Sequence, residues 1–361
     1  MTALCRIAFA SGRNWPVKAA APVALAVLVP CLMLCPAAEQ PQGGAPDQSD
    51  ALARAQALTG AGKNDEAIGL LKPLAAQRPE QPGVEAALGK AYYQKKSLPD
   101  AIRHLEVAIQ QKPGDDESTQ LLGLSYYLLG RATQAIPLLE KVQARLPRPD
   151  PAASYVLGSI YLQTREFDKA RAAFAVMFSV PTGSAQAHLV LGQMMMHQNL
   201  EDQAAPELKQ ALTMDPQLPM AHFLLGEAYL YRSGIEEALD EFQAEIRLNP
   251  VSWLAYWRMG DAYSRLERWD DAERALKQSI WLDKTFTGPY VLLGKVELKK
   301  GDAPLAAGFL ERALKMDPNN SSAHYMLGEA YKKLGRTADA DHEFTLAQSL
   351  KQSEETRPAA P

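Results

Sequence analysis

Cysteine is nearly absent from this sequence. Of 361 residues only three are cysteines, Cys5, Cys31 and Cys35, and all of them lie within the first 35 positions. The rest of the chain therefore has no disulfide, no thiolate nucleophile and no cysteine ligand for a metal. An excess of basic residues is also lacking, because 38 Lys and Arg stand against 42 Asp and Glu and the formal net charge is −4. Since neutralising phosphates requires a clustered basic surface, we expect no nucleic-acid partner.

Short catalytic and cofactor motifs are missing as well. There is no glycine-rich phosphate loop after a strand, no Gly-x-Ser-x-Gly elbow and no His-Glu-x-x-His. Each of these motifs places a nucleophile, a phosphate cradle or a metal ligand on a defined turn or helix, so their absence removes the commonest enzyme classes. We therefore predict a protein that is not an enzyme and that has no cofactor and no metal site.

The N-terminal segment has the organisation of a secretory signal. Residues 1–18 carry three basic and no acidic residues, residues 19–35 are largely apolar, and residues 36–38 are small. The apolar run has 17 residues with two prolines, which is short for a membrane span of about 20 residues. We predict a signal peptide over residues 1–38 and an exported, periplasmic or envelope-associated protein. Membrane contact is expected only if the signal is uncleaved or Cys35 is lipidated.

A repeat of about 34 residues organises nearly everything that follows. Glycines recur 34 residues apart with a single spacing of 35, and leucine or methionine precedes each one. An alanine follows each glycine after twelve residues, and a large apolar residue follows four positions later. The register extends back to one further unit with Ala55 in the glycine position, which gives nine repeats. The glycines are Gly89, Gly123, Gly158, Gly192, Gly226, Gly260, Gly294 and Gly328.

This spacing predicts two antiparallel helices in each repeat. The Leu-Gly pair and a tyrosine three residues later share one stripe of a helix with 3.6 residues per turn. A small residue at the glycine position lets the second helix approach closely. Glycines such as Gly130 and Gly301 stand where the first helix ends, and most repeats close with a proline that stops the second helix. No repeat buries its apolar face alone, so neighbouring repeats must stack.

The combined pattern resembles the tetratricopeptide repeat (TPR) family. The pattern of this family is met over residues 48–352. It consists of a Leu-Gly pair, a tyrosine three residues after the glycine, an alanine twelve residues after the glycine, an apolar residue four positions beyond that alanine, and a closing proline. The resemblance implies an all-α, right-handed superhelical solenoid of about nine helix-turn-helix repeats, with the first helices lining a concave groove. We expect a flexible leader at 39–47 and a disordered tail at 353–361.

The resemblance also implies which residues face the groove. With each glycine at position 8 of its repeat, positions 2, 5, 9, 12 and 13 of the first helix would line it. These positions are aromatic in many repeats and basic toward the C-terminal end, and aromatic and Arg side chains dominate binding hot spots. The predicted partner-binding residues are Tyr93, Tyr127, Tyr155, Phe223, Glu227, Tyr231, Trp257, Asp261, Arg265, Lys299, Tyr325 and Lys333.

Two groups of metal-binding residue types have a simpler interpretation. His188, His222 and His324 share position 4, but only the first two lie in adjacent repeats, and two imidazoles without a third ligand make a weak site. Packing within each repeat is the favoured interpretation. The run Met194 to Met196 points in three directions on a helix, which favours core packing over a soft-metal site.

The sequence therefore predicts a non-catalytic scaffold or adaptor for protein–protein interaction in a bacterial cell envelope. Its partner would be a peptide or helix bound in the concave groove. Three alternatives remain open: a membrane-tethered assembly factor for secretion or pilus biogenesis, a groove that binds a glycan on its aromatic side chains, and a purely structural spacer or self-associating array.

Overall fold

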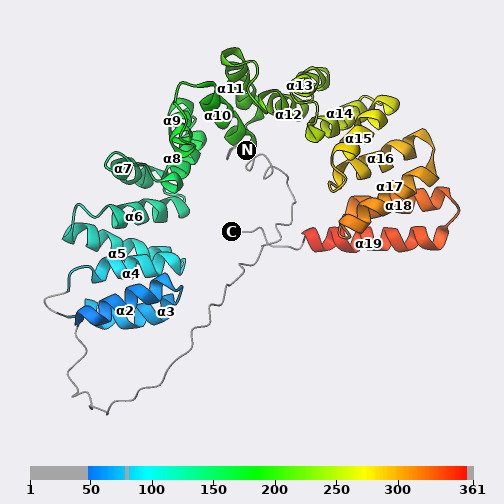
Figure 1. The fold of residues 1–361 in the computed structure, drawn as a ribbon. Coiled ribbons are helices and arrows are strands. Elements are labelled where there is room, and N and C mark those ends of the chain that lie inside the picture. Colours follow the sequence, from blue (N-terminus) through cyan, green and yellow to red (C-terminus); the bar gives the residue numbers. More distant parts are fainter. Residues whose placement is uncertain (1–47, 78–80, 356–361) are drawn as a thin grey trace, which may run out of the picture. The chain divides into compact units, whose positions relative to one another are not determined.

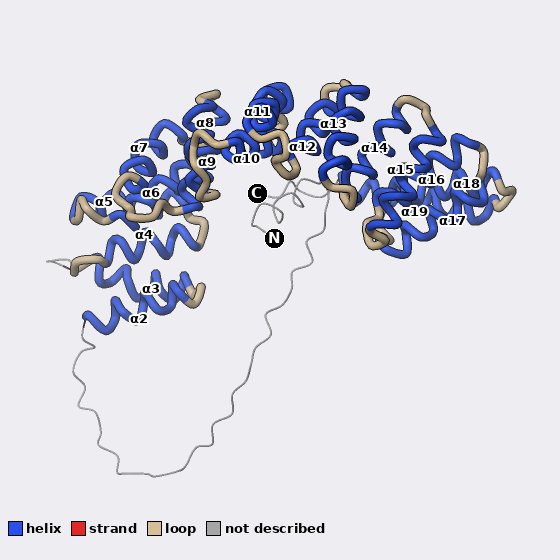
Figure 2. Tube along the Cα trace, turned by 45° about the horizontal axis from the view of Figure 1, so that its top comes forward, coloured by secondary structure: helices blue, strands red, loops and turns tan. Residues whose placement is uncertain are grey.

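The computed structural model describes residues 48–77 and 81–355, which are entirely helical apart from turns (Figures 1 and 2). The predicted signal (1–38), the predicted leader (39–47) and residues 356–361 of the predicted tail lie outside the described residues. The first helices of the nine repeats are α2 (Gln48–Gly60), α4 (Val84–Gln94), α6 (Asp116–Leu128), α8 (Pro151–Gln163), α10 (Ala185–His197), α12 (Ala221–Tyr231), α14 (Trp253–Arg265), α16 (Gly288–Lys300) and α18 (Ser321–Lys333). The second helices are α3 (Asn64–Ala75), α5 (Leu98–Gln111), α7 (Ala132–Gln143), α9 (Phe167–Met177), α11 (Glu201–Met214), α13 (Ile235–Leu248), α15 (Trp269–Leu282), α17 (Ala303–Met316) and α19 (Thr337–Glu355).

These helices confirm the predicted all-α architecture of nine helix pairs. The chain forms two compact units, unit 1 up to Leu157 and unit 2 from Gly158 onward. Within each unit a first helix packs on its own second helix, and that second helix packs on the next first helix. First helices of consecutive repeats also touch, as α4 and α6 do in unit 1 and α12 and α14 do in unit 2. The first helices therefore form one continuous face in each unit.

The glycine at position 8 is where the two helices of a repeat approach most closely. A methyl group added to Gly226 would lie 2.6 Å from the Phe242 ring, and one on Gly192 would lie 2.7 Å from Leu208. Both Phe242 and Leu208 are fully buried. The glycine periodicity thus reflects a space that the second helix fills with one large side chain per repeat.

The predicted left-handed backbone conformation at the end of the first helix is confirmed, and it also occurs at residues that are not glycine. Gly130 and Gly301 have φ values of 73° and 90°. In five other repeats the equivalent residue has the same conformation without being glycine. These residues are Lys96, Arg165, Asn199, Ser233 and Glu267, with φ values of 65°, 61°, 59°, 62° and 57°. The stacked helices impose this turn, so glycine marks it in some repeats only.

The extra residue before α8 is held by side chains of unit 1. Asp150 accepts a hydrogen bond from the Ala153 amide at 2.8 Å and thereby caps the start of α8. The Gln143 side chain accepts from the Asp150 amide at 2.9 Å and donates to its carbonyl at 2.7 Å. Gln120 donates to the Asp150 carboxylate at 2.9 Å. The insertion is therefore absorbed in one fixed turn.

The last helix differs from the others at its C-terminal end. α17 has 14 residues and stops before Asp317-Pro318, whereas α19 has 19 residues and runs to Glu355. No proline follows Leu350 until Pro358, so nothing stops the helix at the usual place. Residues 353–355, which the sequence assigned to a disordered tail, are helical.

Glu297 occupies the position that tyrosine fills in most repeats. Tyr126 and Tyr331 stand at this position and donate hydrogen bonds to a glutamate of the preceding second helix, at 2.5 and 2.9 Å. Glu297 is 2% exposed, and its Oε1 atom has no hydrogen-bond partner. Burial, and then the neighbouring Glu273 carboxylate, raise the pKa of Glu297. This buried charge destabilises the repeat.

We expect Glu297→Tyr to stabilise the protein by about 1 kcal/mol at pH 7. The residue twenty positions earlier is Lys277, and the equivalent Lys209 lies over the Tyr229 ring at 5.3 Å, so the new ring gains a cationic neighbour. Urea unfolding measures the gain. Glu297→Gln serves as the control and should give part of it. Because the pKa of Glu297 is raised, the folded parent takes up a proton first as the pH falls, so the Gln variant's advantage must shrink toward acidic pH; a constant advantage would contradict the prediction.

Candidate functional site

A hollow on the first-helix face of unit 1 lies where α2, α4 and α6 meet. It has a volume of about 350 Å³. Its lining residues stand at positions 2, 3, 5, 6, 9 and 12 of their repeats, and they are small or polar. They are Gln56, Thr59, Gly83, Ala86, Ala87, Lys90, Glu117, Ser118 and Leu121. Lys90 and Glu117 form an ion pair at 2.6 Å across its edge.

The aromatic residues predicted for unit 1 do not line this hollow. Tyr93 and Tyr127 are half-buried. Lys96 lies over the Tyr93 ring at 5.9 Å, and burial raises the pKa of that tyrosine. Tyr155 is 44% exposed. Of the three tyrosines, therefore, only Tyr155 has a largely exposed side chain. The charged residues that line the hollow are Lys90 and Glu117, and neither was among the residues predicted from the sequence.

In unit 2 the first-helix face contains a buried charge network between α12 and α14. Arg258 donates to the Glu227 carboxylate at 2.6 Å and lies 4.0 Å from Asp261. Arg265 donates to Asp261 at 2.8 Å. The side chains of Glu227, Asp261 and Arg258 are 10%, 15% and 19% exposed, whereas that of Arg265 is 43% exposed. The network is thus a chain of alternating charges that leads from the Glu227 carboxylate through Arg258 and Asp261 to the more exposed Arg265.

Burial and pairing act in opposite directions on this network. Burial raises the pKa of Glu227, and the Arg258 guanidinium partly offsets that effect. Burial disfavours the Arg258 charge, but the Glu227 carboxylate outweighs it and the pKa of Arg258 is raised. Arg258 therefore remains charged and holds the glutamate beside it.

Trp257 lies next to this network with a free donor. The Arg258 guanidinium lies over its ring at 4.2 Å, and Phe286 meets it edge-on at 4.8 Å. The Trp257 Nε1 atom, the Arg258 Nε atom and the Glu227 Oε1 atom are buried without a hydrogen-bond partner. Buried polar atoms are normally satisfied, so three unpaired atoms in one place mark an unusual polar site within the helix packing.

Position 5 is open or covered according to the repeat. Phe223 is 6% exposed and packs on Phe242 with ring centroids 5.9 Å apart. Phe223 was predicted as a partner-binding residue, but its ring belongs to the core because the next first helix covers it. Tyr231, at position 13, and Tyr325, at position 5 of the last repeat, are each 54% exposed.

Position 13 carries cations in the last three repeats. The Arg265 guanidinium also reaches the Leu230 carbonyl at 3.4 Å, and Lys333 donates to the Leu298 carbonyl at 3.0 Å. Lys299 is exposed and, like the half-buried Lys295 on the same helix, has no ion pair with a described residue. These side chains give α14, α16 and α18 a basic edge beside the exposed Tyr231.

Arg258 and Lys295 were not among the predicted site residues. A signal for Arg258 was present in the sequence, because it is the sole charged residue at position 6 in nine repeats. Its importance depends on Glu227 of the preceding repeat, which only the stacked structure brings within hydrogen-bond distance.

The position-4 histidines pack within their own repeats, as predicted. His188, His222 and His324 each pair with a glutamate nineteen residues later, at 2.6, 2.6 and 2.5 Å. Met194 and Met195 are buried, which confirms their role in the core. Among the described residues no cluster of three or more His, Cys, Asp or Glu could hold a metal ion. In the same part of the chain, no helix combines the length and apolar character that a membrane span needs.

Family models support the periodic pattern. Three models described as tetratricopeptide repeat match residues 58–124, 220–280 and 309–342. A fourth model, described as anaphase-promoting complex, cyclosome, subunit 3, matches residues 94–177. The matched segments lie in both units.

Several solved structures match this chain at low identity. A MamA structure from Desulfovibrio magneticus RS-1 is 19% identical and covers 48% of this chain and 97% of that chain, with a TM-score of 0.44. YrrB, described as a TPR protein with an unusual peptide-binding site, is 19% identical and covers 47% of this chain and 87% of its own, with a TM-score of 0.41. The APC/C hetero-tetramer Cut9–Hcn1 is 19% identical over 78% of this chain and 55% of that chain, with a TM-score of 0.43. The curated proteins contain no sequence match.

Proposed function

Because the chain belongs to the tetratricopeptide repeat family, we propose that it is a non-catalytic scaffold that binds a peptide or helix of another protein on the first-helix face of unit 2. The observation that carries the proposal is the combination around α12 and α14. An exposed tyrosine and a half-open arginine stand over buried polar atoms without partners. Exposed aromatic and Arg side chains are the residue types that dominate binding hot spots, so Tyr231 and Arg265 are the anchors that a bound segment would engage.

The basic edge indicates the chemistry of the bound segment. Arg265 pairs with Asp261, whereas Lys295 and Lys299 have no ion pair with a described residue. An acidic side chain in the bound segment would be attracted to this edge, which favours fast association and correct register. The proposed ligand is therefore a segment with an apolar or aromatic anchor and at least one acidic residue.

We propose further that the scaffold acts outside the cytoplasm, in a bacterial periplasm or at an envelope surface. Support comes from the basic, apolar and small stretches of residues 1–38. Fractionating cells that express the full chain or its Cys35→Ala variant tests this location. A soluble periplasmic product in both supports the proposal. Membrane association that is lost in Cys35→Ala would replace it with the lipid-tethered assembly factor.

We expect the variant Tyr231→Ala/Arg265→Ala/Lys299→Ala to lose a protein that the parent chain retains from an envelope extract. The variant should bind the identified protein with a Kd at least tenfold higher than that of the parent, because the three substitutions remove one aromatic and two cationic contacts. A tenfold increase in Kd corresponds to a loss of about 1.4 kcal/mol of binding free energy. The bait contains residues 39–361 and thus every described helix. Isothermal titration with the purified partner gives the Kd.

A matched control removes the same residue types from the second helices. Arg247→Ala/Trp281→Ala/Lys315→Ala also deletes one aromatic and two exposed cations, at sites on α13, α15 and α17. This control should bind like the parent. Equal loss in both variants, or loss in the control alone, would move the binding surface to the second helices and reject the first-helix face.

A further inference from the structure

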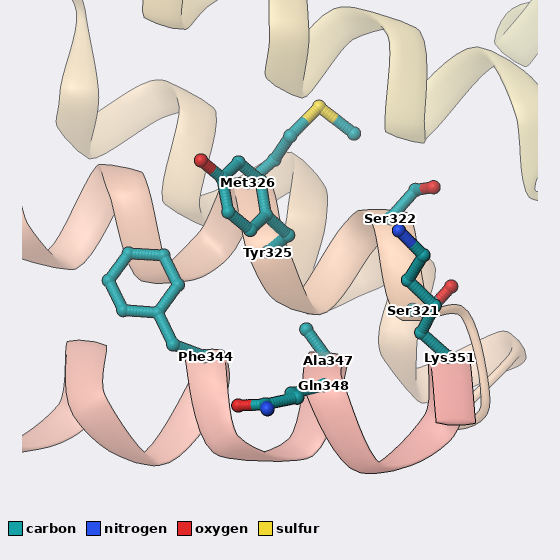
Figure 3. Close-up of a pocket in the computed structure, with 8 residues that line it drawn as sticks. All are labelled: Ser321, Ser322, Tyr325, Met326, Phe344, Ala347, Gln348 and Lys351. Carbon is teal, nitrogen blue, oxygen red and sulfur yellow. The ribbon is translucent and has the colours of Figure 1, made fainter. Parts of the chain in front are cut away.

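A second cavity lies at the end of the last repeat, between α18 and α19 (Figure 3). It has a volume of about 870 Å³. Tyr325 and Met326 from α18 and Phe344 and Ala347 from α19 form its apolar part, and Gln348 and Lys351 stand at its polar edge. None of the groove residues predicted from the other repeats contributes to it.

The same pair of rings occurs in repeat 6, where it is covered. Tyr325 and Phe344 have ring centroids 5.5 Å apart at 54°, and Phe223 and Phe242 stand at the same repeat positions with 5.9 Å and 46°. Tyr325 is 54% exposed, whereas Phe223 is 6% exposed. In repeat 6 the helix α14 packs on α12 and α13, whereas no first helix among the described residues follows α19. The cavity is therefore an uncovered seat at the place that α14 occupies in repeat 6.

Internal repeats show what a helix in this seat must present. Five of the covering helices, α8, α10, α12, α14 and α18, have alanine at position 3, and every covering helix has leucine or methionine four positions later. In repeat 6 these are Ala221 and Leu225, and in repeat 9 they are Ala323 and Leu327, all of them at most 2% exposed. The first helix also runs antiparallel to the second helix before it, so its N-terminal turn would lie near Lys351. An acidic residue there would suit both the lysine and the helix dipole.

The chain's own candidates for this role do not fit. The first helix α2 has Asp50 and Arg54 at positions 3 and 7, where the covering helices have an uncharged residue and leucine or methionine. A second copy stacked end to end would therefore bring two charges against the apolar seat.

We propose that the seat formed by Tyr325, Met326, Phe344, Ala347, Gln348 and Lys351 binds one amphipathic helix of a partner protein. This helix carries a small residue and a large apolar residue four positions apart, as α14 does with Ala255 and Met259. It continues the stack as a tenth first helix supplied in trans. The interface is separate from the first-helix face of the proposed function and can succeed or fail independently of it.

The probe is a hydrocarbon-stapled, fluorescein-labelled peptide with the sequence of residues 252–266, which contains α14, the helix that covers the matching seat. Stapling holds the peptide helical, since a free helix of this length is marginal in water. Fluorescence anisotropy with the chain of residues 39–361 should show saturable binding. In the seat variant Tyr325→Glu/Gln348→Glu, the Kd should be at least tenfold weaker, because two charges enter the apolar contact.

The control variant is Tyr231→Glu/Ser349→Glu. It makes the same two changes at a tyrosine that is also 54% exposed and at an α19 residue outside the cavity lining. This variant should bind the probe like the parent while weakening a first-helix-face partner. Circular dichroism must show the same helicity and thermal midpoint for both variants. If Tyr325→Glu unfolds the chain, Lys351→Glu replaces it, because Lys351 lines the cavity with an exposed side chain and its loss should also weaken binding of the probe.

Three results would overturn the proposal. The first is an absence of saturable binding to the parent chain, and the second is equal binding by the seat and control variants. The third is a dimer of the unlabelled chain in sedimentation equilibrium that the seat variant alone dissociates, because the occupant would then be a second copy.

Discussion

Replacing Arg258 by methionine is expected to lower the free energy of unfolding of unit 2 by about 3–5 kcal/mol at pH 7. Methionine fills a similar volume and keeps contact with Trp257, so the main loss is the charge. Glu227 then remains buried with no cation at hydrogen-bond distance, and its second oxygen already has no partner in the parent. A buried carboxylate without its counterion is among the costliest single defects a helical core can contain.

The pH dependence identifies the cause of this loss. Burial already raises the pKa of Glu227 against the opposing effect of Arg258, so removing the arginine raises it further. The folded variant then binds a proton more readily than the unfolded chain, and its stability must increase as the pH falls through the window between the two pKa values. Denaturant unfolding at a series of pH values should show the variant approaching the parent under mildly acidic conditions.

The double variant Arg258→Met/Glu227→Met provides the matched control. Removing both charges leaves apolar side chains in an apolar layer, and such replacements are often close to neutral. Most of the stability lost in Arg258→Met should therefore return. A double variant as unstable as the single one would show that the arginine stem, and not the buried charge, supports the contact between α12 and α14.

The helix pairs could be predicted because their determinants lie close together in the sequence. The glycine at position 8 and the large residue at position 24 are sixteen residues apart, and each such pair specifies one tight contact, as Gly226 and Phe242 do. The turn after the first helix was only partly predictable. Lys96 and Glu267 adopt the same left-handed conformation as Gly130, since the packing of both flanking helices overrides their local preference.

The site was less predictable because exposure at a given position depends on the following repeat. Phe223 and Tyr325 both stand at position 5, and each packs on a phenylalanine at position 24 of its own repeat. The Phe223 ring is buried, whereas the Tyr325 ring is exposed. No local pattern distinguishes them, and Tyr155 at the same position is 44% exposed although repeat 5 follows it, so the packing of the neighbouring repeats decides the exposure. Arg258 illustrates the same limit, since its role comes from a glutamate 31 residues earlier in the neighbouring repeat.

The second large effect is expected from Phe242→Ala, which should destabilise unit 2 by about 3–5 kcal/mol. The ring is fully buried, lies against Gly226 and packs on Phe223. Gly226 has no side chain that could move into the space, and the helices above and below hold the backbone in place. The cavity therefore remains, and its unfilled volume adds to the lost transfer free energy.

Phe344→Ala is the matched comparison, because Phe344 holds position 24 of the last repeat and lies against Gly328 in the same way. Its side chain is half-buried and borders the open seat, so part of its surface is already in contact with water and the truncated site can be solvated. We expect a loss of roughly half that of Phe242→Ala. Urea unfolding of both variants measures the difference. Equal losses would mean that the end of the array is as well covered as its interior, and would remove the structural basis for a helix seat between α18 and α19.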